Sequence, residues 1–203
     1  MLGKPDRSSL ESMKSHGKVC KWLLVVLAGI LVLQSIGLIA DICYFLWIPS
    51  DQVRLTDSGD AVKVQALFGY FRFSSESLPP SYVDVSGKIL GLSSSVFSLL
   101  LQKVPLFIVL WKCIQIFKIM IRSHSPFDRE ICRGIKVTGW IVLYLGAMEK
   151  LLFQIGVSLV SCHEIWFHNP FQLTILAAGA VILAAGDIFA YGCELQKESD
   201  ELL

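Results

Sequence analysis

The sequence lacks the short motifs by which many catalytic and metal-binding sites are recognised. It contains no Gly-x-Ser-x-Gly, no His-Glu-x-x-His and no Gly-rich phosphate loop. Its six cysteines show no Cys-x-x-Cys spacing, which argues against a zinc site or a redox motif. We therefore expect no enzyme, no metal site and no bound cofactor, and we expect no direct binding of nucleic acid.

Charged residues are also scarce. They make up 17% of the 203 residues, whereas soluble domains usually carry about 25%. The shortfall is concentrated in a few long apolar runs of roughly 20 residues, the length that crosses the hydrocarbon core of a bilayer. The chain is therefore predicted to be an all-α integral membrane protein whose main partner is the lipid bilayer.

Four apolar runs predict a single membrane domain over residues 22–193. The first run does not resemble a cleaved signal peptide, because it follows a polar leader and exceeds the ~7–15 apolar residues of such a signal. The leader, residues 1–21, is expected to be mostly disordered. The predicted spanning helices cover residues 22–48, 90–121, 137–161 and 171–193, and a polar tail follows over 194–203.

The outer loop, residues 49–89, has a strand-like pattern. Val62–Leu67 and Tyr70–Phe73 alternate apolar and polar residues around Phe68-Gly69, which predicts a hairpin. Tyr82–Val85 is expected to add a third strand. The loop is too short to bury a large core of its own, so a small β-like structural cap is favoured over an outer recognition surface.

Basic residues predict the orientation in the membrane. The leader contains five lysines and arginines, and the connector Arg122–Lys136 together with Lys118 contains another five. Cationic flanks stay on the cytoplasmic side of a membrane. We therefore expect both termini in the cytoplasm and the cap on the extracytoplasmic side, in a multi-pass inner-membrane protein.

Ionisable residues inside the apolar runs are the candidate functional residues, because each costs roughly 2.5–3.5 kcal/mol to insert unless it is paired or hydrated. We expect Lys112 to pair with Asp187 or Glu149, and Lys103 to pair with Asp41. Such pairs would fix helix register, or they would line a proton, ion or ligand pathway. The complete set is Asp187, Lys112, Glu149, Lys150, Asp41 and Lys103.

Small residues and cysteines leave two further alternatives open. Ala180-x-x-x-Ala184 and Gly186-x-x-x-Ala190 let helices approach closely, either within one chain or in a homodimer. Cys43 and Cys162 are both expected on the outer side, where a disulfide could join them. The other cysteines are expected to be inert.

Pro105 is expected to kink the second helix.

Two stretches, Ser125–Trp140 and Ala185–Gln196, carry a resemblance. The first is similar to a Pro-Phe-x-x-Glu-Asn, basic pair, Ile-Gly-Trp connector, and the second to a terminal Glu-Ile-Phe-Arg-Tyr-Gly-x-Glu-Leu-Gln signature. Together they resemble the DUF2975 family of bacterial four-helix membrane proteins, with Asp187 and Ala190 as departures from its usual Glu and Arg. The residues that carry the resemblance are Pro126, Phe127, Gly139, Trp140, Tyr191, Gly192, Glu194, Leu195 and Gln196.

The resemblance implies the four-helix topology and a bacterial inner membrane. Members of that family are often encoded beside a small helix-turn-helix regulator, which associates them with regulation. We therefore expect a non-enzymatic regulatory or sensing membrane component that binds a cytoplasmic protein partner through the connector and the C-terminal extension. The alternative is a small transporter or channel-like subunit in which Glu149, Lys112 and Asp187 line one hydrated cavity.

Overall fold

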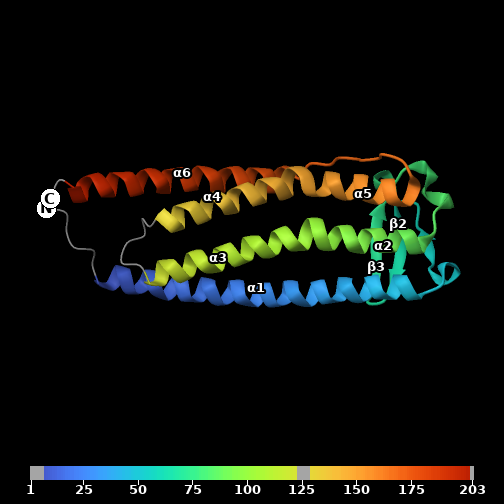
Figure 1. Ribbon diagram of the computed structural model, residues 1–203, viewed down its shortest axis with the longest axis horizontal. Coiled ribbons are helices and arrows are strands. Elements are labelled where there is room, and N and C mark those ends of the chain that lie inside the picture. Colours follow the sequence, from blue (N-terminus) through green and yellow to red (C-terminus); the bar gives the residue numbers. More distant parts are fainter. Residues whose placement is uncertain (1–6, 123–128, 202–203) are drawn as a thin grey trace. The chain divides into compact units, whose positions relative to one another are not determined.

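A computed structural model of the protein describes residues 7–122 and 129–201. In these two ranges, four helical segments are long and apolar enough to cross a membrane (Figure 1). They cover Gly17–Trp47, Gly87–Ile121, Arg129–Cys162 and Leu173–Glu198. The predictions of a mostly helical chain, of four helices long and apolar enough to span a membrane and of a small β-structured segment between the first two are confirmed.

The chain divides into two compact units, each considered by itself. Unit 1 comprises Met1–Ile30, Phe107–Leu143 and Ala177–Leu203, and unit 2 comprises Leu31–Leu106 and Tyr144–Leu176.

The first helix, α1, extends over Arg7–Trp47 and begins well before the predicted start at residue 22. Residues 1–6 of the leader lie outside the described residues. No proline stands between Arg7 and the apolar run, and extending an existing helix costs far less than nucleating one. The expectation of a mostly disordered leader is therefore wrong from Arg7 onward.

The second and third spans are each interrupted by a π-helical turn. Helix α2 (Gly87–Phe97) continues through the turn Ser98–Lys103 into α3 (Val104–Arg122). Pro105 is the second residue after this turn, and the wider winding accommodates a residue that has no N–H to donate. Helix α4 (Arg129–Tyr144) likewise continues through Leu145–Glu149 into α5 (Lys150–Cys162).

The last helix, α6, covers Leu173–Glu201 without interruption. It starts two residues later than expected and continues through most of the predicted polar tail. The residues after Cys193 include good helix formers such as Leu195, Gln196 and Lys197, so nothing in the sequence ends the helix at the end of the apolar run.

The cap is a three-stranded antiparallel sheet of order β1-β2-β3, formed by Leu55–Asp57, Ala61–Ala66 and Gly69–Ser74. The predicted hairpin is confirmed, with Ala66 paired to Gly69 across the turn. The third predicted strand is wrong, because Pro80–Asp84 forms a 3₁₀ helix. Pro79 and Pro80 have fixed φ angles and no N–H groups, so this stretch cannot join a ladder, and Leu55–Asp57 pairs with β2 instead.

The core of the cap is shared with helices of unit 2. Val62 and Val64 of β2 are fully buried, and they cluster with Phe45 of α1, Leu90 of α2 and Val157 of α5. The sheet therefore completes its hydrophobic core on helix ends. This agrees with the expectation that the loop is too short to fold around a core of its own.

Candidate functional site

Helices α4 and α6 approach each other through glycines within unit 1. A Cβ atom on Gly139 of α4 would lie 2.8 Å from the Leu183 side chain, and one on Gly179 of α6 would lie 2.8 Å from the Leu143 backbone nitrogen. The two helices are antiparallel, since residue numbers rise on one as they fall on the other (Figure 1). Only residues without a side chain permit this separation, which is the usual way in which helices associate in lipid.

A salt bridge lies further along the same contact. Lys136 Nζ of α4 is 2.7 Å from Asp187 Oδ1 of α6, and the side chains are 42% and 73% exposed. Gly186 lies against the stem of Lys136, which brings that side chain over α6. Asp187 is thus neutralised by a neighbour on α4 at the end of the apolar run.

Two cysteines lie beyond this salt bridge. Cys132 Sγ of α4 is 2.9 Å from Cys193 Sγ of α6. Both line a pocket of about 300 Å³, together with Arg129, Ala190, Glu194 and Lys197. We call the pocket residues together with Lys136 and Asp187 the α4–α6 surface.

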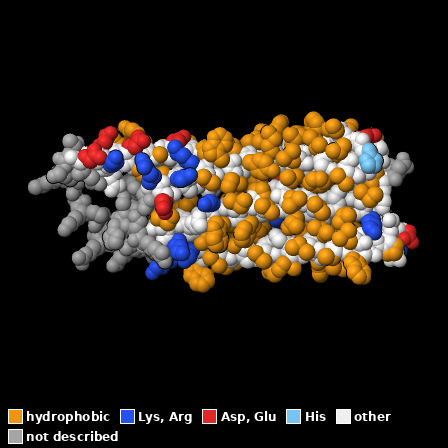
Figure 2. Space-filling model, in the orientation of Figure 1, with side chains coloured by type: hydrophobic (Ala, Val, Ile, Leu, Met, Phe, Trp, Pro, Cys, Tyr) orange, Lys and Arg blue, Asp and Glu red, His pale blue; other side chains and the backbone are white. Residues whose placement is uncertain are grey.

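The rim of the α4–α6 surface is polar and open to solvent. Arg129, Glu194 and Lys197 are exposed, and Lys197 reaches Glu201 at 3.6 Å one turn later. Figure 2 shows basic and acidic side chains gathered over this stretch, beside the hydrophobic side chains that cover the apolar part of the helices. The arrangement suits charge-based recognition of another macromolecule.

The expected pair of Lys112 with Asp187 is wrong, because Asp187 pairs with Lys136. Lys112 donates instead to Gln115 Oε1 at 3.4 Å, one turn along α3. It lines a separate cavity of about 380 Å³, and Asp187 is not among the residues that form it. The other lining residues are Gln115, Ile116, Ile119, Glu130, Arg133, Gly134 and Val137.

In unit 2, Lys103 lies in the first π-helical turn and Glu149 lies in the second. Lys103 donates to Gln34 Oε1 at 2.8 Å, and Glu149 accepts from Gln172 Nε2 at 2.8 Å. Each of these two ionisable side chains is therefore hydrogen-bonded to a glutamine. These partners were missed because a π turn changes which helix face a residue occupies.

Asp41 serves a different purpose from the one expected. Its carboxylate accepts the Leu67 backbone N–H at 3.0 Å, and the residue is buried. Leu67 lies in the turn between β2 and β3. The expected Lys103–Asp41 pair is wrong, and Asp41 fastens the hairpin turn of the cap to α1.

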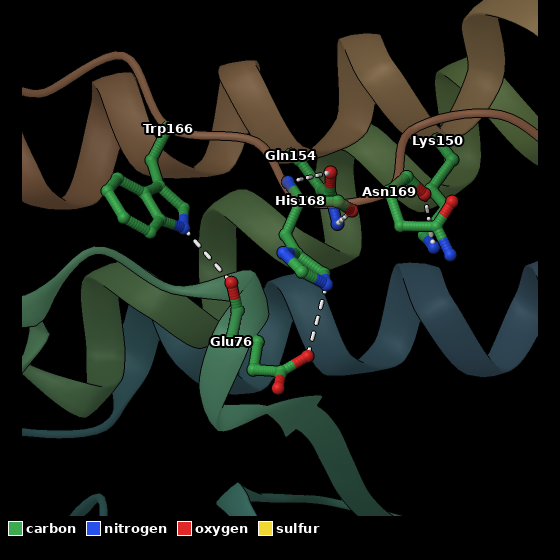
Figure 3. A network of polar contacts seen from close by, with 6 residues as sticks. All are labelled: Glu76, Lys150, Gln154, Trp166, His168 and Asn169. Carbon is green, nitrogen blue, oxygen red and sulfur yellow. Dashed lines mark hydrogen bonds and ion pairs between the residues drawn. The ribbon is translucent and has the colours of Figure 1, made fainter.

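Lys150 and its neighbours hold the turn between α5 and α6 (Figure 3). Lys150 Nζ donates to the Asn169 carbonyl at 2.7 Å, and Gln154 exchanges two bonds with the His168 backbone. The His168 imidazole lies 3.0 Å from Glu76, whose carbonyl also accepts the Trp166 indole N–H. These contacts join the turn between α5 and α6 to the cap, and they give Lys150 a structural role.

The residues that carry the family resemblance fall into three groups. Pro126 and Phe127 lie outside the described residues. Gly139 has a clear physical role, since it lets α4 touch α6. The remaining ones lie on α4 and α6, exposed or partly exposed, and are Trp140, Tyr191, Gly192, Glu194, Leu195 and Gln196.

Cysteine placement differs from what the sequence suggested. Cys43 and Cys162 are free thiols in unit 2, so the disulfide considered between them is not formed. The contact between Cys132 and Cys193 was missed, because it depends on the register of α4 against α6. Gly139, Gly179 and Gly186 would have indicated that register, had they been used to align the two helices.

Comparisons with family models, with curated proteins and with solved structures find no match for this chain.

Proposed function

We propose that the protein is a non-enzymatic regulatory or sensing component of a membrane, and that it binds a cytoplasmic protein through the α4–α6 surface. The observation that carries the proposal is the exposed, mixed-charge rim where the first turn of α4 lies beside the polar end of α6. Rims of this kind are typical of surfaces that recognise charged partners.

The orientation is part of the proposal. We place the α4–α6 surface in the cytoplasm and the cap outside, because lysines and arginines flank the spans on the side of the surface. Single-cysteine variants at Ser58 in the cap and Glu198 on α6 test this in intact cells. A membrane-impermeant maleimide should label the first without permeabilisation and the second only after it; the reverse pattern would overturn the orientation.

Membership of the DUF2975 family, and with it a bacterial inner membrane, belongs to the same proposal. Its support is the sequence resemblance on α4 and α6, which includes Gly139 at the helix contact. A small helix-turn-helix regulator, the neighbour that the resemblance implies, is the first partner to test. A second copy of the chain is the other outcome to distinguish, since Ala180 and Ala184 are exposed on α6.

Site-specific photo-crosslinking in native membranes tests the binding surface. A photoreactive residue at Arg129 or Lys197 should give a crosslinked product with one defined protein, identified by mass spectrometry. The matched control is the same residue at Lys63 on β2 of the cap, which should not give that product. Equal products from all three positions, or none from the first two, would contradict the proposal.

Charge reversal tests whether the partner binds to Arg129 and Lys197 or only lies near them. Arg129→Glu combined with Lys197→Glu should reduce the crosslink from a third position, Glu194, by at least about tenfold if the two cations dock the partner, because opposed charges become like charges. Lys63→Glu is the matched control and should leave it unchanged.

The transport alternative is not proposed. It required Glu149, Lys112 and Asp187 to line one cavity. Asp187 is highly exposed and bound to Lys136, whereas Lys112 lines a cavity without it and Glu149 is bonded to Gln172. These contacts of the described residues give the transport alternative no support.

A further inference from the structure

The α4–α6 surface holds two thiols in contact. The sulfurs of Cys132 and Cys193 are 2.9 Å apart, although the residues are 61 positions apart in the sequence. A disulfide has an S–S bond of about 2.05 Å, so bond formation requires the sulfurs to move by less than about 1 Å. The helix register set by the glycines therefore brings these two side chains to within bonding reach.

The surroundings favour thiol chemistry. Both sulfurs line the 300 Å³ pocket, where Cys193 is partly exposed and Cys132 is buried. Arg129, Glu194 and Lys197 also line the pocket, so two cations and one anion lie around the sulfurs. The thiolate is the nucleophilic form of cysteine.

We propose that Cys132 and Cys193 form a reversible redox pair, oxidised by hydrogen peroxide to a disulfide that joins α4 to α6. The Cys193 thiolate attacks peroxide, the O–O bond breaks, and the sulfenic acid forms as hydroxide leaves and takes up the thiol proton to become water. The Cys132 sulfur then attacks the sulfenic sulfur, the S–S bond forms, and a second water leaves with its proton. A low-molecular-weight thiol, itself oxidised to a disulfide, restores both thiols.

The regulatory meaning of this pair rests on the proposed function. A disulfide would lock the beginning of α4 to the end of α6, and so fix the spacing of Arg129 and Lys197 across the rim. Oxidation would then change partner binding. The redox pair itself depends only on the geometry of the two sulfurs.

The test uses the full chain in its membrane. Vesicles are treated with hydrogen peroxide, blocked with N-ethylmaleimide, digested without reducing agent and analysed by mass spectrometry. The expected product is one peptide pair that joins Cys132 to Cys193, with two fewer maleimide adducts per chain and complete reversal by dithiothreitol. Random disulfides among several cysteines, or oxidation of each thiol on its own, would overturn the inference.

Variants give matched controls. Cys132→Ser and Cys193→Ser should each abolish the linked peptide, whereas Cys113→Ser on α3 should leave its yield unchanged. Serine differs from cysteine by one atom, and Cys132→Ala provides a second variant if the serine chain fails to insert. A linked product that survives Cys132→Ser would exclude this pair.

The two proposals fail separately. If the disulfide forms but no photo-crosslinked partner is found at Arg129, the proposed function fails and the redox pair stands. If the partner is crosslinked equally before and after oxidation, the redox pair stands as a modification without control over binding. If no disulfide forms while the partner is crosslinked, the inference fails and the function stands.

Discussion

The contact between α4 and α6 in unit 1 and the cap of unit 2 are held together by different forces. Glycines bring the helices of the first within backbone contact, and the cap buries large side chains such as Phe45, Val64 and Leu90. Lipid is as apolar as leucine, so helices in a bilayer gain little from burying leucine and more from close packing. The cap has a core of large apolar side chains, and its stabilisation comes from removing their surface from water.

The largest loss of stability is expected from a substitution at Phe45. Phe45→Ala should lower the free energy of unfolding of unit 2 by about 3–5 kcal/mol, because the ring is fully buried in the cap core. Denaturant unfolding in nanodiscs, followed by tryptophan fluorescence, measures this. The matched control is the neighbouring Leu46→Ala, whose exposed side chain should contribute far less; equal losses would contradict a cap core at this position.

The α4–α6 contact should be destabilised by adding a methyl group, whereas the cap core is destabilised by removing a side chain. Gly179→Ala should cost about 1–3 kcal/mol, since the new Cβ would lie 2.8 Å from a backbone atom that cannot rotate away. Gly29→Ala on α1 is the control. No atom beyond its own helix and chain neighbours lies within 4 Å of that position, so it should be neutral or mildly stabilising. A neutral Gly179→Ala would mean that the helices are not in backbone contact.

Asp41 links a helix to the sheet by one charged hydrogen bond, and its loss should have an intermediate effect. Asp41→Ala should cost about 1–3 kcal/mol, because the Leu67 N–H loses its acceptor. Asp41→Asn keeps an acceptor and should cost less. Amide exchange at Leu67, measured by NMR, should accelerate in the alanine variant. Equal effects of both variants would point to a lost charge pair instead.

Low pH and high pH should each lower the stability of the cap slightly. The pKa of Asp57 is lowered from 3.8 by hydrogen bonds from the Tyr82 hydroxyl and the Gly59 N–H, and the pKa of Tyr82 is raised from 10.0 by Asp57. The folded cap thus favours ionised Asp57 and neutral Tyr82. Its stabilisation should be lost as the pH falls through the lowered pKa of Asp57, and as it rises through the raised pKa of Tyr82. Tyr82→Phe should remove the alkaline loss and reduce the acidic one in a pH series of unfolding curves.

The smallest change is expected at the exposed salt bridge. Asp187→Asn should leave the unfolding free energy of unit 1 nearly unchanged, because the carboxylate is 73% exposed and water screens its attraction to Lys136. Unfolding curves of the two proteins at low and at high salt measure this difference in free energy. A loss as large as that of Gly179→Ala would show that the pair orders the two helices.

Much of the fold was accessible from the sequence because apolar length and alternation are local signals. The spans and the β2–β3 hairpin were predicted, whereas Tyr82–Val85 was assigned to a strand despite the preceding prolines. The partners of Asp187, Lys103 and Asp41 were missed for another reason. They depend on helix register and on two π-helical turns, which hydropathy does not report.

The residues of the α4–α6 surface were only partly predicted. Asp187 and Glu194 were singled out, but Cys132 and Cys193 were expected to be inert because both were predicted to lie towards the reducing side of the membrane. Their significance arises only when α4 and α6 are aligned side by side. A search for glycines that match across two antiparallel spans would recover that alignment.

The shared core of the cap also sets an order of assembly during synthesis. Val62 and Val64 leave the ribosome long before Val157, which completes their cluster, and before Trp166, which donates to Glu76. The apolar face of the sheet therefore stays incomplete while the residues between β3 and α5 are synthesised. The cluster is complete only once Val157 has been made.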